Sequence, residues 1–87
     1  MIVYVVKKQF VLDNRAPDEV IGICSSIHEV HNIIRKHLKP PIASVWPNDH
    51  RFAYEQWHIN GDIVGYYVFT TDEIQKIFTE SIFYKNT

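Results

Sequence analysis

The chain has 87 residues, of which 46% are hydrophobic, 14% aromatic and 22% charged, and its formal net charge is −1 at pH 7. A chain of this length forms one domain, residues 1–87, and it is too apolar and too aromatic to be disordered. The near-zero charge excludes a protein that holds a polyanion by bulk electrostatics, so we expect no nucleic-acid partner. The longest apolar stretch, residues 63–69, is far below the roughly 20 residues of a membrane-spanning helix. With one cysteine and no signal-peptide pattern at residues 1–8, the sequence predicts a cytoplasmic protein without a membrane contact.

The first half of the chain predicts two strands and a helix. The β-favouring residues 2–12 predict a strand, the turn formers of residues 13–18 a loop, and residues 19–24 a second strand in an antiparallel hairpin with the first. Ser26 and Glu29 fit a capping box, in which the Ser hydroxyl accepts from a backbone N–H and the Glu carboxylate accepts from the Ser N–H. Apolar residues at helical spacing then predict a helix that ends before Pro40.

The second half predicts a hairpin at Asn60-Gly61, because residues 52–59 and 62–69 are both rich in β-formers. Asn-Gly suits a two-residue type I′ turn, which requires a positive φ at both central residues. With such a turn, the cross-strand pairs are Trp57 with Val64, Glu55 with Tyr66, and Tyr54 with Tyr67.

Thr70 and Glu73 repeat the capping box and begin a second amphipathic helix over about residues 71–83, with residues 84–87 expected to fray. The element order ββαββα predicts an α+β fold: a four-stranded antiparallel sheet with two helices on one face. The two capping boxes lie 44 residues apart. The two halves of the chain are either a duplication or two unrelated units that look alike because each consists of a strand followed by a capped helix.

Part of the chain resembles a type of small phage and bacterial ββαβ protein of unknown function. The resemblance rests on Val3-Tyr4-Val5-Val6, the strand end at residues 21–26, the capped helix through Leu38, and the acidic-aromatic residues 54–57. It covers about half the chain and brings no catalytic residue, but it implies an origin in a mobile element. The chain departs from that type in its loop at residues 39–51 and in the strand and helix after Ile59. On this resemblance, the protein is expected to be an inhibitor or adaptor of a host protein.

No arrangement of residues predicts a catalytic or metal site. Cys24 follows a strand and precedes a helix, where a thiol is either activated by the helix N-terminus or simply packed. His28 and His31 lie one helical turn apart and could share a metal ion, but the spacing supplies no third ligand. The acidic pairs at residues 18–19 and 72–73 lie at element boundaries, and no phosphate-binding glycine loop is present. We therefore expect no enzymatic activity, no metal and no cofactor.

Aromatic residues and one basic cluster are the candidate contacts for a partner. Trp46 lies in the long loop and is either an interface anchor or a lid on the core, and Arg35 belongs to a basic cluster at a helix C-terminus. The strands carry apolar residues at both odd and even positions, although a sheet with one wet face alternates apolar and polar residues. The candidate binding residues are Trp46, Tyr54, Trp57, Tyr66, Tyr67 and Arg35.

These features predict a non-enzymatic protein-interaction module, either a homodimer or a complex with a host protein. The contact is expected through the second sheet face or an edge strand, with tyrosines at its centre. The alternative is a small-ligand or nucleotide-binding protein whose pocket lies between the sheet and the loop at residues 39–51.

Overall fold

The computed structural model describes residues 1–12, 16–37 and 50–85. It confirms the α+β fold with the order ββαββα, and the strands form one antiparallel sheet in the order β2-β1-β3-β4. The elements are β1 (Ile2–Phe10), β2 (Glu19–Cys24), α1 (Ile27–His37), β3 (His50–His58), β4 (Ile63–Val68) and α2 (Thr71–Lys85). Because β3 begins at His50, the predicted connection at residues 39–51 is shorter than expected. Residues 39–49 of that connection, with Trp46, lie outside the described residues.

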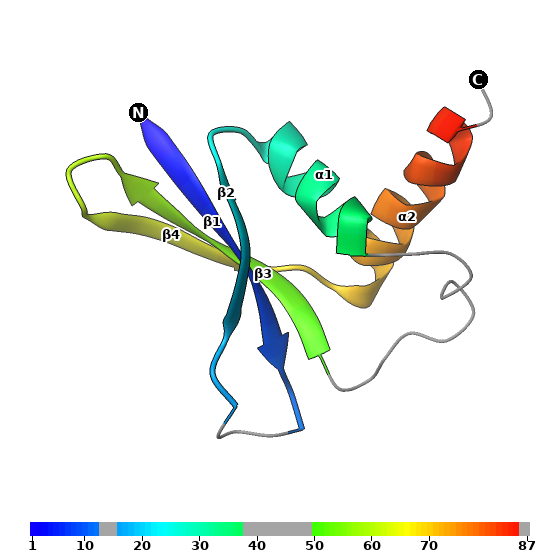
Figure 1. The fold of residues 1–87 in the computed structure, drawn as a ribbon, viewed down its shortest axis with the longest axis horizontal. Coiled ribbons are helices and arrows are strands. Elements are labelled where there is room, and N and C mark those ends of the chain that lie inside the picture. Colours follow the sequence, from blue (N-terminus) through cyan, green and yellow to red (C-terminus); the bar gives the residue numbers. More distant parts are fainter. Residues whose placement is uncertain (13–15, 38–49, 86–87) are drawn as a thin grey trace.

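Both helices lie on the same side of the sheet (Figure 1). Alternate residues of a strand face opposite sides, so one set of strand side chains meets the helices and the other set faces away. The hydrophobic core lies between the sheet and the helices. Its buried members are Val6, Val30, Ile34, Phe52, Phe69, Ile74 and Ile77.

The two capping boxes fix where the helices begin. Ser26 Oγ accepts from the Glu29 N–H at 3.2 Å, but the Glu29 carboxylate accepts from the N–H of Ser25 at 3.1 Å rather than that of Ser26. At α2 the box is reciprocal: Thr70 Oγ1 accepts from the Glu73 N–H at 3.1 Å, and Glu73 Oε1 accepts from the Thr70 N–H at 3.0 Å. The helix extends through Lys85, so the predicted end at residue 83 is two residues too early.

The hairpin between β3 and β4 forms where it was predicted, but its turn differs. The Gly61 N–H donates to the His58 carbonyl at 2.9 Å, and the His58 N–H donates to the Asp62 carbonyl at 2.8 Å. Gly61 has a φ of 100°, whereas Asn60 does not have a positive φ, so the expected type I′ turn is wrong. The hydrogen bonds define a three-residue loop that ends in a left-handed glycine. Asn60 stabilises it instead through its Oδ1, which accepts from the Asp62 N–H at 3.2 Å.

Each edge strand contains a β-bulge. In β2 the bulge is Ile21, because Val6 pairs with Gly22 and Lys7 with Val20. A bulge leaves one residue without a partner on the neighbouring strand. Beyond it the pairing is offset by one residue, so the following side chains point to the opposite face from the one that regular pairing would give them. Bulges on edge strands also hinder pairing with a strand of another molecule.

In β4 the bulge is Val64, because Gln56 pairs with Gly65 and Trp57 with Ile63. The predicted pairing of Trp57 with Val64 is therefore wrong. The pairs beyond the bulge, Tyr54 with Tyr67 and Glu55 with Tyr66, are confirmed.

Candidate functional site

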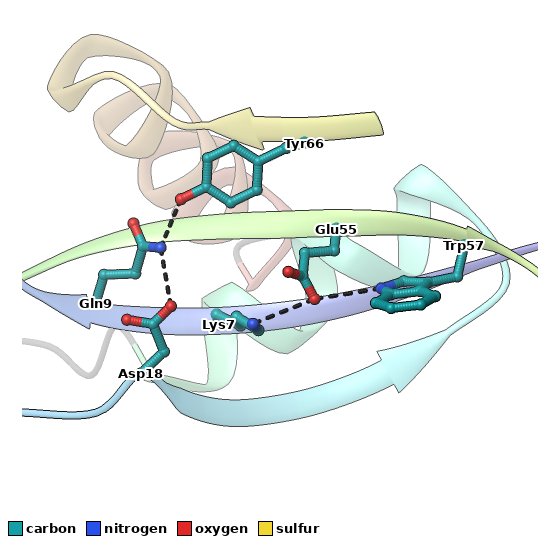
Figure 2. Close-up of polar contacts among 6 residues, drawn as sticks. All are labelled: Lys7, Gln9, Asp18, Glu55, Trp57 and Tyr66. Carbon is teal, nitrogen blue, oxygen red and sulfur yellow. Dashed lines mark hydrogen bonds and ion pairs between the residues drawn. The ribbon is translucent and has the colours of Figure 1, made fainter. Parts of the chain in front are cut away.

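The sheet face away from the helices, here called the open face, is the candidate site. In Figure 2 the helices lie behind the sheet, and side chains of three strands meet in front of it. The pairing register places the following residues on this face: Val3, Val5, Lys7, Gln9, Val20, Ile23, Arg51, Ala53, Glu55, Trp57, Ile63, Tyr66 and Val68.

One part of the open face is apolar. Trp57 lies between Val3 and Ile63 in the register, and Val5 lies beside Ile23 on the next row. We call these five residues the apolar end. Ile23 is 66% exposed and Ile63 53% exposed, and no element among the described residues covers them. Large aliphatic side chains with this exposure on one sheet face make the apolar end a candidate contact surface.

The centre of the open face is organised around Glu55. Its Oε1 lies 3.2 Å from Lys7 Nζ and accepts a hydrogen bond from Trp57 Nε1 at 3.2 Å (Figure 2). Both side chains of the ion pair are about one-fifth exposed. The carboxylate therefore satisfies the Trp57 indole and fixes its ring at the border of the apolar end.

Gln9 organises the rest of the polar region. Its Nε2 donates to Asp18 Oδ2 at 3.1 Å and to the Tyr66 hydroxyl at 2.5 Å, and its Oε1 accepts from Arg51 Nε at 2.9 Å. Tyr66 thus reaches from β4 over β3 to β1, as Figure 2 shows. Ala53 lies on β3 on this same face and is completely buried. Lys7, Gln9, Asp18, Arg51, Glu55 and Tyr66 are called the polar end below.

The structure divides the predicted binding residues between different surfaces. Trp57 and Tyr66 lie on the open face. Tyr54 and Tyr67 lie on the opposite face, where their rings stack with centroids 5.5 Å apart and Tyr54 also meets Tyr4 edge-on at 5.4 Å. The expectation of several tyrosines at the centre of the second face is therefore wrong, since among the described tyrosines Tyr66 alone is there.

Arg35 has a contact role between the helices. Its Nη1 donates to Asn32 Oδ1 at 2.7 Å, and its Nε lies 3.5 Å from the Ile77 carbonyl of α2. The contact with Ile77 joins α1 to α2 on the far side of the sheet from the open face. Trp46, the sixth predicted residue, lies outside the described residues.

Sequence reasoning missed the apolar end as a unit. Its members come from four strands, and the bulges at Ile21 and Val64 hide the register that brings Ile23 and Ile63 to the same face as Trp57. The available signal was the excess of apolar residues at both odd and even strand positions.

Cys24 is a packed thiol. Its Sγ donates to the Ser26 carbonyl at 3.6 Å, and burial raises the pKa of the Cys24 thiol above its ordinary value. The thiol therefore stays protonated at neutral pH. This favours the packed interpretation over an activated nucleophile.

Histidines and acidic residues form no metal site in the part of the chain that the structure describes. The His31 ring meets Phe69 edge-on at 6.0 Å, and His28 is exposed. A cavity of about 220 Å³ lies at the α1–α2 junction and is lined by His31, Phe69, Glu73, Lys76 and Ile77. Ligand pockets usually measure about 300–1,000 Å³. The cavity is on the helix side of the sheet, away from the open face.

Glu73 provides a pH-dependent test of the α2 cap. The Tyr67 hydroxyl donates to its carboxylate, and this hydrogen bond is the main reason why the pKa of Glu73 is below its ordinary value of 4.5. A lowered carboxyl pKa stabilises the fold above the unfolded-state pKa, and this stabilisation is lost as pH falls through the folded-state pKa. Tyr67→Phe should therefore raise the pKa of Glu73 toward its ordinary value and weaken the acid dependence of stability below about pH 4.5.

The measurement is an NMR titration of the Glu73 carboxyl carbon. Tyr66→Phe is the matched control, because the Tyr66 hydroxyl contacts Gln9 instead. An unchanged Glu73 pKa in the Tyr67 variant would contradict the assigned hydrogen bond.

No protein-family model, no curated protein and no solved structure matches this chain. Among the described residues, neither helix is long and apolar enough to cross a membrane.

Proposed function

We propose that this chain is a non-enzymatic protein-interaction module that binds, through the open face, a protein surface that is partly apolar and whose charges balance. The observation that carries the proposal is the apolar end, five hydrophobic side chains from four adjacent strands, of which Ile23 and Ile63 are exposed and the other three are partly exposed. A sheet holds these side chains in fixed positions before binding, so little conformational entropy is lost when a partner docks.

The exposure of Ile23 and Ile63 supports a binding role for the apolar end. Exposed apolar patches of a few hundred Å² commonly mark interaction sites on small proteins. At about 25 cal/mol per Å², burying such a patch contributes several kcal/mol before the entropic losses of association. Trp57 at its border is of the residue type that most often dominates binding energy at interfaces.

The charges on the polar end indicate the chemistry of the partner. Lys7 is paired with Glu55, and Arg51 is linked to Asp18 through Gln9, so two positive and two negative side chains balance. A partner therefore need not supply compensating charge. A strongly acidic or basic partner would have to disrupt contacts that are already satisfied.

Two kinds of partner fit this surface: a second copy of the chain, and a host protein. The resemblance to small phage and bacterial proteins stays a prediction, and on it the module would act as an inhibitor or adaptor of the host protein.

Site-specific photo-crosslinking tests the proposal. A photo-reactive side chain at position 23, on the open face, should give crosslinked products in extracts of the source cells, whereas the same group at Leu12 should not. Leu12 is a matched control because it is 77% exposed and lies beyond the end of β1. The crosslinked products should disappear when an excess of unlabelled wild-type chain competes for the partner. They should persist when the unlabelled competitor is Ile23→Arg. The protein found in the crosslinked product should also bind the purified chain. Equal products from both positions would overturn the proposal.

A further inference from the structure

We propose that the open face binds a second copy of this chain in a symmetric, face-to-face dimer whose two-fold axis runs parallel to β1 and β3. This inference rests on the proposed function and names its partner. The reasons are the size of the face, the pattern of residues on it, its charge and the shape of the sheet edges.

The area of the face fits a weak dimer. Four strands about 4.8 Å apart and six to nine residues long, at roughly 3.3 Å per residue, present on the order of 500 Å² before side-chain relief is added. Standard interfaces bury about 800 Å² on each partner, and transient ones bury less than about 600 Å². The area of the face is therefore that of a transient interface.

The order of the strands selects the direction of the axis. β1 and β3 are the two central strands, so an axis between them and parallel to them places β1 of one copy over β3 of the other, and β2 over β4. Each row of residues then meets the same row of the second copy. Val3 then faces Trp57 in two symmetric contacts, and Ile23 faces the ring of Tyr66. An axis perpendicular to the strands would instead place Val3 and Trp57 over Gln9 and Arg51.

The parallel axis places no charged side chain directly over a like charge. In the same rows, Glu55 lies over Val5 of the second copy, Lys7 over the position of the buried Ala53, and Arg51 over Gln9. Each Lys7–Glu55 pair enters the interface already formed, so neither charge is buried alone. A net charge of −1 per chain adds little repulsion between copies.

The sheet edges argue against the other dimer geometry. Edge-to-edge pairing would use β2 or β4, and each of these strands carries a bulge, Ile21 or Val64. Bulges interrupt the row of hydrogen-bonding groups that an added strand requires. Self-association is therefore directed to the face.

Sedimentation equilibrium over roughly 5–200 μM tests the dimer. The average mass of the wild-type chain should rise with concentration from 10.3 kDa toward twice that value. Ile23→Arg places a charge in the apolar contact and should weaken dimerisation by roughly tenfold or more. Leu12→Arg carries the same charge at a similarly exposed position off the face and should dimerise like the wild type.

Mixing two weakened variants tests the axis. In a symmetric dimer, position 23 of each copy contacts position 66 of the other, so this contact occurs twice. Ile23→Arg and Tyr66→Glu should each dimerise poorly alone. Mixed together they should form a heterodimer, because one of the two contacts then joins Arg to Glu and the other joins the unchanged Ile23 and Tyr66. Circular dichroism of each variant checks that it is folded. No gain on mixing would overturn the parallel axis.

A wild-type chain that stays at 10.3 kDa throughout would overturn the dimer. If position 23 still crosslinks a different protein, the dimer fails but the interaction module stands. If it crosslinks nothing, both fail.

Discussion

Ile34→Ala should lower the free energy of unfolding by about 2–5 kcal/mol, the usual cost of removing a fully buried aliphatic side chain. Ile34 is completely buried and joins α1 to the core, together with Val30 and Val6. The loss combines the transfer free energy of the missing carbons with that of the cavity they leave. Because each kcal/mol shifts the melting temperature of a domain of this size by about 4–8 °C, the variant should melt at least 8 °C lower.

Ile27→Ala is the control for this prediction. It makes the same change on the same helix, but Ile27 is 39% exposed, so its loss should be under about 1 kcal/mol. Urea unfolding of both variants at equal concentration gives the comparison. Equal losses would contradict the packing of α1 against the sheet through Ile34.

Gly22→Val should destabilise the fold by about 1–3 kcal/mol through overpacking. A Cβ at this position would lie 2.7 Å from Ile33 Cδ1 and 3.0 Å from Ile33 Cγ2. Carbon atoms attract at about 3.5–4.0 Å and repel strongly below that separation. Since Ile33 packs between α1 and the sheet, the substitution must either displace the Ile33 side chain from its packed position or push the helix away from β2.

The double variant Gly22→Val/Ile33→Ala identifies the cause. Gly22→Val adds three side-chain carbons on the strand, and Ile33→Ala removes three from the facing helix. The double variant should therefore lose less free energy of unfolding than the sum of the losses of the two single variants. The expected difference, the coupling free energy, is about 0.5–3 kcal/mol. Gly65→Val is the matched control on the other edge strand, where the added Cβ first meets Gln56 Oε1, the mobile end of a flexible side chain. Additive losses in the double variant would show that Gly22 is needed for another reason.

The elements and their order could be predicted because they depend on local signals. The side chains of Ser26 and Thr70 cap their helices by accepting from the backbone N–H three residues later, and Gly61 marks the hairpin through its own φ. Such signals involve neighbours in sequence, and short-range chemistry determines them. The turn type was wrong because Asn60 has a second way to stabilise a turn, through its side chain.

The site could be predicted only in part, because it depends on the alignment of distant strands. Trp57 and Tyr66 were identified as candidate contacts by residue type alone, but so was Tyr54, which faces the helices. One bulge reverses the facing of every later residue in a strand. The sequence signal for the bulges at Ile21 and Val64 was the glycine that follows each of them, Gly22 and Gly65, and the predicted register took no account of it. The Gln9–Tyr66 contact joins residues 57 positions apart and requires the complete sheet.

The central place of β1 in the sheet has a consequence for biosynthesis. β1 is translated before β3, and about 40 residues must be added before its second neighbour can pair with it. Until then one side of Val3-Tyr4-Val5-Val6 has unsatisfied backbone groups, and such a run can pair with the same run of another nascent chain. Lys7 and Lys8 follow it directly, and their charges oppose the in-register stacking of identical strands. We therefore expect Lys7 to oppose aggregation of the unfinished chain, and its ion pair with Glu55 can form only once β3 has docked.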